Sequence, residues 1–274
     1  MENSYRGDAN SQLLLPAWDL PGEVLADQPL TVAVPPLLCA EGGLLFGGWA
    51  MALAAEVGRR WSGRHVRSLT CEFLAPIRAG DELSVTVRVL RAGSRVSHCA
   101  VTLGCGDRAD QAAFTARIVA GDGFVPQARA WSPAPEVPDP DACPGRTFRY
   151  RGAGTANDTL DVRLASPEPS PEDDRGGQVL LWARVRCDVD PSAALAVLSD
   201  HVPYLIVRSI GGVRYATSVS STVRLTGSPV DEWVLLEVEL AAQDGQFCIG
   251  RVRQWGSDGT LLAVADQTAY LRFD

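Results

Sequence analysis

The sequence predicts an α+β protein in which an antiparallel sheet wraps around a central helix, with this unit present twice. Three observations favour it. Each half of the 274-residue chain has an apolar helix followed by runs that alternate apolar and polar residues. A proline-rich segment separates the halves, and the second helical run, 193–207, has almost no polar face. One helix followed by several strands, repeated, is typical of two packed α+β units.

The first half opens with a helix predicted over 46–60, FGGWAMALAAEVGRR, which follows a glycine-rich stretch. A strand, RSLTCEFLAP, comes next, and then LSVTVRVLRA, RVSHCAVTLG and QAAFTARIV. Period-two alternation in these runs is typical of strands that have one covered face.

The second half repeats this order after an opening strand, GQVLLWARVRC. A helix is predicted to begin at Asp190-Pro191, because Asp is a good N-cap and Pro suits the first helical position. The strands ATSVSSTVRL, WVLLEVELA, QFCIGRVRQW and LLAVADQTAYLRF follow. The helical run is almost wholly apolar apart from Asp200, a carboxylate that is costly to bury alone.

Nine of the 18 prolines lie in 125–171, which rules out a helix or a central strand there. We therefore expect an N-terminal unit over 1–124, a proline-rich linker over 125–157 and a C-terminal unit over 158–274. The halves also share turns: Pro76 precedes the acidic pair 81–82, as Pro229 precedes the acidic pair 231–232.

Composition narrows the function classes. The net charge of −8 argues against nucleic acid or an anionic membrane as a partner. All 25 basic residues are arginine, which excludes Schiff-base chemistry on lysine. We expect no metal, cofactor or disulfide framework, since seven scattered cysteines form no C-x-x-C pair and there are three histidines. A polar start and the lack of a long apolar run predict a cytoplasmic protein with no membrane association.

Several motifs together resemble the acyl-CoA thioesterase II family, which has the double hotdog fold. In the first half these are LFGGWAMALAAE and RSLTCEFLAP. In the second half they are LSDHVPYL, ATSVSSTVRL, EWVLLEVE, SDGTLLA and DQTAYLR. The resemblance covers 30–124 and 158–274, and it implies two tandem hotdog repeats, each with an antiparallel sheet wrapped around a central helix.

The resemblance also implies a catalytic set of an Asp on the second helix, a Thr or Ser on the next strand, and a Gln near the C-terminus. By position these are Asp200, Thr217 and Gln267. The segment between the first two is shorter than the family pattern, so Ser218 and Ser220 are alternatives for the hydroxyl. The acid that usually follows the Thr is absent here.

A carboxylate, a hydroxyl and a carboxamide suit the hydrolysis of a thioester. The carboxylate takes a proton from an attacking water, and the other two groups fix that water by hydrogen bonds. An apolar environment raises the pKa and the basicity of the acid. Backbone N–H groups of Gly47 and Gly48, at the start of the first helix, are candidates to bind the oxyanion. The alternative for Asp200 is a structural role, bonded to the neighbouring backbone.

Other polar residues have competing interpretations. Glu56 lies nine residues after Gly47, just as Asp200 lies nine after Pro191, so it is a second candidate acid. An ion pair with Arg59 and Arg60 is the more common explanation of Glu56. His201 in HVP is faintly similar to the His-Pro motif of hotdog dehydratases.

The arginines near the end of the first helix have two interpretations as well. Arg59, Arg60 and Arg64 are candidates for contacts with the phosphates of coenzyme A. A solvated helix end is the other explanation for them.

These inferences predict a homo-oligomeric hydrolase that acts on an acyl thioester of coenzyme A or of a carrier protein. Two alternatives stay open at this point. One is a dehydratase, acyltransferase or cyclase that acts on the same class of substrate in a biosynthetic pathway. The other is a module that binds an acyl chain without turnover.

Overall fold

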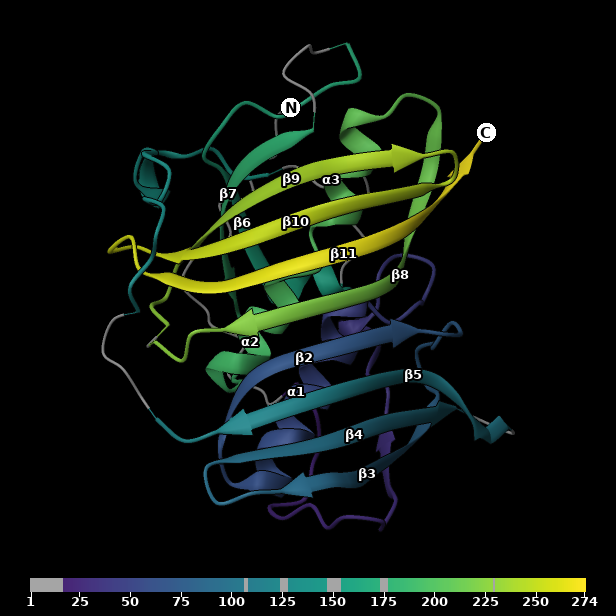
Figure 1. The fold of residues 1–274 in the computed structure, drawn as a ribbon. Helices are drawn as coiled ribbons and strands as arrows, with labels where there is room; N and C mark the ends of the chain where they lie inside the picture. Colours follow the sequence, from purple (N-terminus) through teal and green to yellow (C-terminus); the bar gives the residue numbers. More distant parts are fainter. Residues whose placement is uncertain (1–16, 106–107, 124–127, 147–153, 173–176, 229) are drawn as a thin grey trace, which may run out of the picture.

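The computed structural model describes residues 17–105, 108–123, 128–146, 154–172, 177–228 and 230–274. In this part of the chain, a single antiparallel sheet of eleven strands curves around three α-helices (Figure 1). The strands are β1 Leu30–Ala33, β2 His65–Phe73, β3 Glu82–Ala92, β4 Val96–Cys105, β5 Arg108–Gly121, β6 Leu160–Leu164, β7 Gln178–Val185, β8 Val213–Leu225, β9 Val234–Asp244, β10 Phe247–Gly256 and β11 Leu261–Phe273. The predicted α+β class is confirmed.

The strand order is β1-β3-β4-β5-β2-β8-β11-β10-β9-β7-β6, so the sheets of the two halves join where β2 pairs with β8. Sequence patterns did not predict the short edge strands β1 and β6. Each has only four or five residues, too few to show a clear alternation. The two strands at the junction, β2 and β8, were both predicted from the sequence. Their pairing brings the two halves together under the helices.

The first predicted helix is confirmed as α1, Gly47–Ser62. It ends at Gly63, which adopts the left-handed conformation with φ 65° and donates its N–H to the carbonyl of Arg59. Ten of its residues are buried, consistent with enclosure by a sheet. The predicted start of the second helix is also confirmed, because the Asp190 side chain accepts a hydrogen bond from the N–H of Ser192.

The prediction of one helix through 193–207 is wrong. The chain forms α2, Pro191–Leu198, and α3, Val202–Ser209, with residues 199–201 between them. Pro203 explains the interruption, because it has no N–H to donate to the carbonyl of Ser199, four residues earlier. Asp200 therefore lies at a break between two helices rather than inside one.

The two halves share the irregularities of their sheets as well as their order. Arg67 of β2 has no partner on β5, and Val219 of β8 has no partner on β11. Leu90 of β3 and Ala241 of β9 are likewise skipped by β4 and β10. Bulges at matching places align the halves residue by residue.

In this alignment β2 corresponds to β8, β5 to β11, β4 to β10 and β3 to β9. Gly47 and Pro191 are the first residues of α1 and α2. The correspondence identifies equivalent positions in the two halves, which is useful wherever one half has a polar group and the other does not.

The helices of the two halves pack directly on each other. A Cβ on Gly48 would lie 2.6 Å from the carbonyl oxygen of Val197, so α1 and α2 approach too closely for any side chain there. Buried residues from both helices and from the inner face of the sheet form one continuous core. The beginning of α1 is thereby fixed against the end of α2, where Asp200 follows.

Part of the proline-rich segment packs on the outer face of the second half. Trp182 donates its indole N–H to the carbonyl of Pro138 at 2.9 Å, and Cys143 is buried with Trp182, Leu235 and Trp255. A one-turn 3₁₀ helix, Pro140–Ala142, precedes that cysteine. The division into units at 124 and 158 stays a prediction. No helix in the described part of the chain is long and apolar enough to cross a membrane.

Candidate active site

Asp200 is the centre of a buried polar cluster, with only 5% of its surface exposed. Its Oδ1 accepts hydrogen bonds from Gln267 Nε2 at 2.5 Å and from Ser218 Oγ at 3.0 Å. Its Oδ2 accepts one from the backbone N–H of Gly48 at 2.8 Å. A fourth hydrogen bond closes the cluster, since Gln267 Nε2 also donates to Ser218 Oγ at 2.8 Å. The donors come from three elements, so the fold itself assembles the site.

Strand alternation places the two side chains that meet Asp200. Ser218 lies on β8 and Gln267 on β11, which pair antiparallel, and both face the helices. Gln267 is 2% exposed on a strand whose other inward residues are apolar. The sequence predicted Asp200 and Gln267 as partners, and the structure brings these two side chains together.

The structure places Ser218, not Thr217, beside the acid. Thr217 is exposed, on the opposite face of β8. The bulge at Val219 turns Ser220 to the outer face too, where it pairs with Glu72 of β2. Ser218 was the first alternative to Thr217, and one residue of register separates them because neighbouring strand residues face opposite ways.

The two glycines at the start of α1 are at the site, but Gly48 is already engaged. Its N–H binds Asp200 Oδ2, and a Cβ on Gly47 would lie 2.7 Å from the same oxygen. The acid thus lies against the helix N-terminus, where the backbone favours negative charge. The Gly47 amide is left as the candidate donor to an oxyanion.

Burial raises the pKa of Asp200 to about 6, and the hydrogen bonds from Gln267, Ser218 and Gly48 oppose this rise. At pH 7 such a group is ionised in a ratio of about ten to one, and it accepts a proton far more readily than an exposed Asp. A carboxylate has about four acceptor positions. Three are filled, so one stays available for the hydrogen of a water molecule.

His201, next to the acid in sequence, has a different environment. Its ring lies 2% exposed, with Nδ1 at 3.0 Å from the carbonyl oxygen of Leu198. Burial and the positive charge of Arg146 lower its pKa to about 3, although the hydrogen bond with the Leu198 carbonyl acts in the opposite direction. The imidazole is therefore neutral near pH 7, and its contact is with the backbone of α2 rather than with Asp200.

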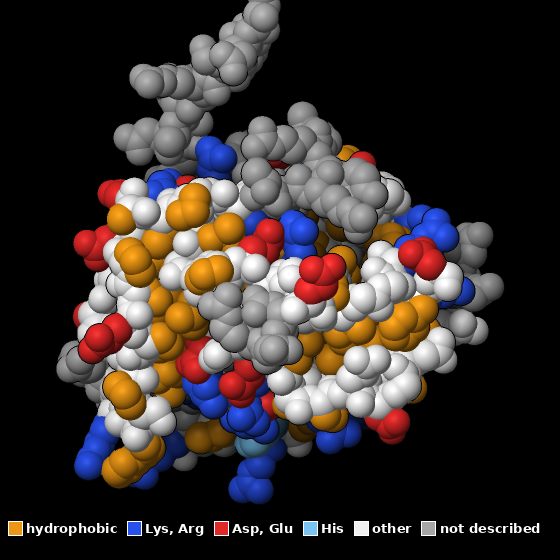
Figure 2. All heavy atoms as spheres, turned by 90° about the horizontal axis from the view of Figure 1, so that it is seen from above, with side chains coloured by type: hydrophobic (Ala, Val, Ile, Leu, Met, Phe, Trp, Pro, Cys, Tyr) orange, Lys and Arg blue, Asp and Glu red, His pale blue; other side chains and the backbone are white. Residues whose placement is uncertain are grey.

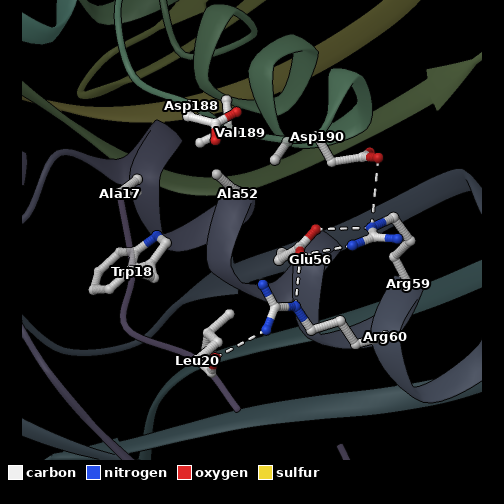
Figure 3. Close-up of a pocket in the computed structure, with 11 residues that line it drawn as sticks. Ala17, Trp18, Leu20, Ala52, Glu56, Arg59, Arg60, Asp188, Val189 and Asp190 are labelled. Atoms are coloured by element: carbon white, nitrogen blue, oxygen red, sulfur yellow. Dashed lines mark hydrogen bonds and ion pairs between the residues drawn. The ribbon is translucent and has the colours of Figure 1, made fainter. Parts of the chain in front are cut away.

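Glu56, the second candidate acid, is held by ion pairs as its sequence neighbours suggested. Its carboxylate accepts from Arg59 at 2.8 Å and from Arg60 at 2.6 Å. Burial raises its pKa, but the hydrogen bonds and charges of the two arginines outweigh this and leave the pKa lowered. Figure 3 shows the carboxylate between the two guanidinium groups.

A cavity of about 320 Å³ adjoins Glu56 rather than Asp200. Its lining comes from α1, from the residues before α2 and from an N-terminal segment that includes Trp18 and Leu20 (Figure 3). Arg60 donates to the carbonyls of Leu20 and Pro21 at its edge. Neither Asp200 nor its partners line this cavity.

The arginines predicted to contact coenzyme A bind acceptors of the protein. Arg64 donates to the backbone of Gly93 and Ser94 and to Ser97 Oγ. Arg59 lies eleven residues after Gly48 along α1, a distance of about 16 Å at 1.5 Å per residue. A contact with the phosphates stays a prediction for Arg59, Arg60 and Arg64.

Comparison with known families places this site in context. Models of the acyl-CoA thioesterase N-terminal domain and C-terminal domain match residues 35–121 and 132–271. A candidate thioesterase structure from Novosphingobium aromaticivorans has 30% sequence identity and a TM-score of 0.77, and the match covers 93% of this chain and 100% of that chain. No protein with a curated description matches the sequence.

More distant structures share the fold. The acyl-CoA thioesterase II TesB2 from Mycobacterium marinum has 21% identity and a TM-score of 0.64, over 84% of this chain and 90% of that one. A bifunctional dehydratase-cyclase domain from ambruticin biosynthesis has 17% identity and a TM-score of 0.52, over 93% and 99%. At these identities the likeness shows the fold alone.

A duplicated unit of one sheet around central helices, with an acid where the halves meet, defines a double hotdog protein of the thioesterase type. The two family models together span most of the chain. The chain belongs to the acyl-CoA thioesterase family, as its motifs had indicated.

Proposed function

We propose that the protein hydrolyses acyl thioesters of coenzyme A or of a carrier protein, with Asp200 as the general base. One observation carries the proposal: a buried carboxylate is held by a hydroxyl, a carboxamide and a helix N-terminal amide. Family membership supports the substrate class. His201 gives no support to a dehydratase, since its ring is directed to the carbonyl of Leu198.

In the proposed step, a water molecule donates one hydrogen to Asp200 and attacks the thioester carbonyl carbon. The carboxylate takes that proton as the new C–O bond forms, and the carbonyl oxygen becomes an oxyanion. The C–S bond then breaks, and the proton passes from Asp200 to the leaving thiolate. The products are a carboxylic acid and a free thiol, and the enzyme returns to its initial state.

The partners of Asp200 have distinct roles in this step. Gln267 donates to both Asp200 and Ser218, which fixes the rotamer of the acid and the orientation of the hydroxyl. Ser218 keeps a lone pair that can accept from the same water. The Gly47 amide, at the positive end of α1, is the proposed donor to the oxyanion.

We also propose a cytoplasmic homo-oligomer that uses no cofactor. All seven cysteines are free, as expected in a reducing compartment. Tyr215, Val219, Phe247, Ile249 and Phe273 are large exposed apolar residues on β8, β10 and β11. Hydrophobic side chains also lie among the charged ones on the face seen from above (Figure 2). Burial of such a patch favours association, and a solution mass above 29.3 kDa by light scattering is the expected result.

The test is release of free thiol from a panel of acyl-CoAs and acyl-carrier proteins that differ in chain length. Rapid release with one acid formed per thiol supports hydrolysis. Loss of substrate without free thiol would show another reaction on the same class of substrate, and binding without either change would show a binding module. Both of these results contradict the proposal.

A further inference from the structure

A second buried glutamine, Gln254, binds Ser199, the residue just before Asp200, much as Gln267 binds Asp200 itself. Gln254 lies on β10 and is fully buried. Its Nε2 donates to Ser199 Oγ at 2.7 Å and to the carbonyl of Leu195 at 2.9 Å. Ser199 and Asp200 are the first two residues of the helix break, so neighbouring strands hold neighbouring residues with the same chemical group.

The proton assignments in this cluster are fixed by its acceptors. The Leu195 carbonyl can only accept, so the amide nitrogen of Gln254, not its oxygen, must face it. Ser199 Oγ donates to that carbonyl at 2.8 Å and accepts from Gln254. The arrangement matches that of Gln267, Ser218 and Asp200, in which a serine also donates to an acceptor and accepts from the glutamine.

Both glutamines leave a buried Oε1 with no partner in the described part of the chain. An unpaired buried carbonyl is costly, and a leucine in its place would remove that cost. The equivalent inward residue of the first half is a leucine: Leu103 on β4 corresponds to Gln254 on β10 through the shared register. A glutamine at this position stabilises the fold less than a leucine would, so its presence calls for a reason other than packing.

We propose that Gln254, with Ser199, is a positioning residue for Asp200. Its two hydrogen bonds fix the last turn of α2 and the first residue of the break, which sets the direction from which Asp200 reaches the N-terminus of α1. The residue acts through the acid and has no contact with substrate. This inference rests on the proposed function of Asp200.

The experiment is a double-mutant cycle between Gln254→Leu and Asp200→Asn. Gln254→Leu is expected to fold, because the Leu195 carbonyl keeps the N–H and Oγ of Ser199 as donors. It should lower kcat for the preferred acyl-CoA about 10- to 100-fold and leave KM within about threefold, as expected when a reacting group is misplaced. In the Asp200→Asn background it should cause no further loss, because its effect passes through the carboxylate. Ser199→Ala should reproduce a smaller loss of the same kind.

The control is Ser97→Ala, which removes a buried hydroxyl that binds Arg64 in the other half. It should leave kcat unchanged. A folded Gln254→Leu with wild-type kcat, or an equal loss in both backgrounds, would overturn the positioning role. If the wild type hydrolyses no thioester, the proposed function fails by itself. The inference is then decided by NMR titration of the Asp200 carboxyl, whose pKa should rise in Gln254→Leu as its three donors separate from it. An unchanged titration overturns it.

Discussion

Asp200 and Glu56 occupy equivalent places in the two halves, yet their environments are opposite. Each lies nine residues after the first residue of its helix, Pro191 or Gly47. Asp200 is bound by uncharged donors and has a raised pKa, whereas Glu56 is bound by two arginines and has a lowered pKa. A charged partner stabilises the ion and reduces its tendency to take a proton. Only the first environment suits a general base.

The strands show how the duplicated scaffold came to differ. The shared bulges align Ser218 of β8 with Val66 of β2, and Gln267 of β11 with Ile118 of β5. Both residues of the first half are buried and apolar. The N-terminal half therefore has an acid on its helix but no hydroxyl or amide at the two strand positions equivalent to Ser218 and Gln267. Equivalent backbones support one candidate site, and a few inward side chains decide which half has it.

The first way to test this contrast is to neutralise each acid. Asp200→Asn should lower kcat/KM for the preferred acyl-CoA about 10³-fold, within the range for loss of a general base. Glu56→Gln should leave it within about threefold, because its carboxylate pairs with arginines away from the proposed chemistry. Steady-state thiol release measures both. A large loss from Glu56→Gln alone would move the site to the other half.

The two acids should also have opposite effects on the pH dependence of stability. The folded pKa of Asp200, about 6, exceeds its ordinary value of 3.8. Its contribution is therefore fully present below pH 3.8 and is lost as the pH rises through 6. That loss is about 3 kcal/mol at 1.36 kcal/mol per pKa unit. Asp200→Asn should thus become more stable relative to wild type between pH 4 and pH 7.

Glu56 has the reverse sign, because its folded pKa is lowered from 4.5. Its contribution is present above pH 4.5 and is lost as the pH falls through the folded pKa. Glu56→Gln should be less stable than wild type at pH 7, by an amount that shrinks in acid. Urea unfolding of both variants at several pH values measures these differences. A parallel pH dependence of the two would contradict the contrast between the sites.

Sequence patterns predicted the parts of this molecule that depend on local order. The helix at 46–60 and the cap at Asp190 follow from spacing and residue type, whereas Gln267 was implied by the family resemblance of DQTAYLR. The choice between Thr217 and Ser218 does not follow from such patterns, because one residue of register decides which hydroxyl faces inward. The alternation of apolar and polar residues does not reveal the bulge at Val219.

Long-range contacts explain what else the sequence left open. The engagement of Gly48 by Asp200 joins residues 152 positions apart, which no local pattern reports. The signal for Gln254 was present, since it continues the inward series Cys248, Gly250 and Val252 along β10. The inward position of Gln254 could not be interpreted until its partners, Leu195 of α2 and Ser199, were known. Tertiary contacts, rather than propensity, place the polar groups of this site.

The smallest effect distinguishes two neighbouring hydroxyls of β8, Thr217 and Ser218, and so tests the site at single-residue resolution. Ser218→Ala removes a hydrogen bond to the Asp200 carboxylate and should lower kcat/KM about tenfold, the equivalent of 1.4 kcal/mol for a bond to a charged group. Thr217→Val should stay within about twofold of wild type, because Thr217 lies on the exposed face of the strand. Thiol release with matched melting temperatures checks both. If Thr217→Val were the more damaging change, the inward face of β8 would be assigned wrongly, and the alignment of Ser218 with Val66 would lose its basis.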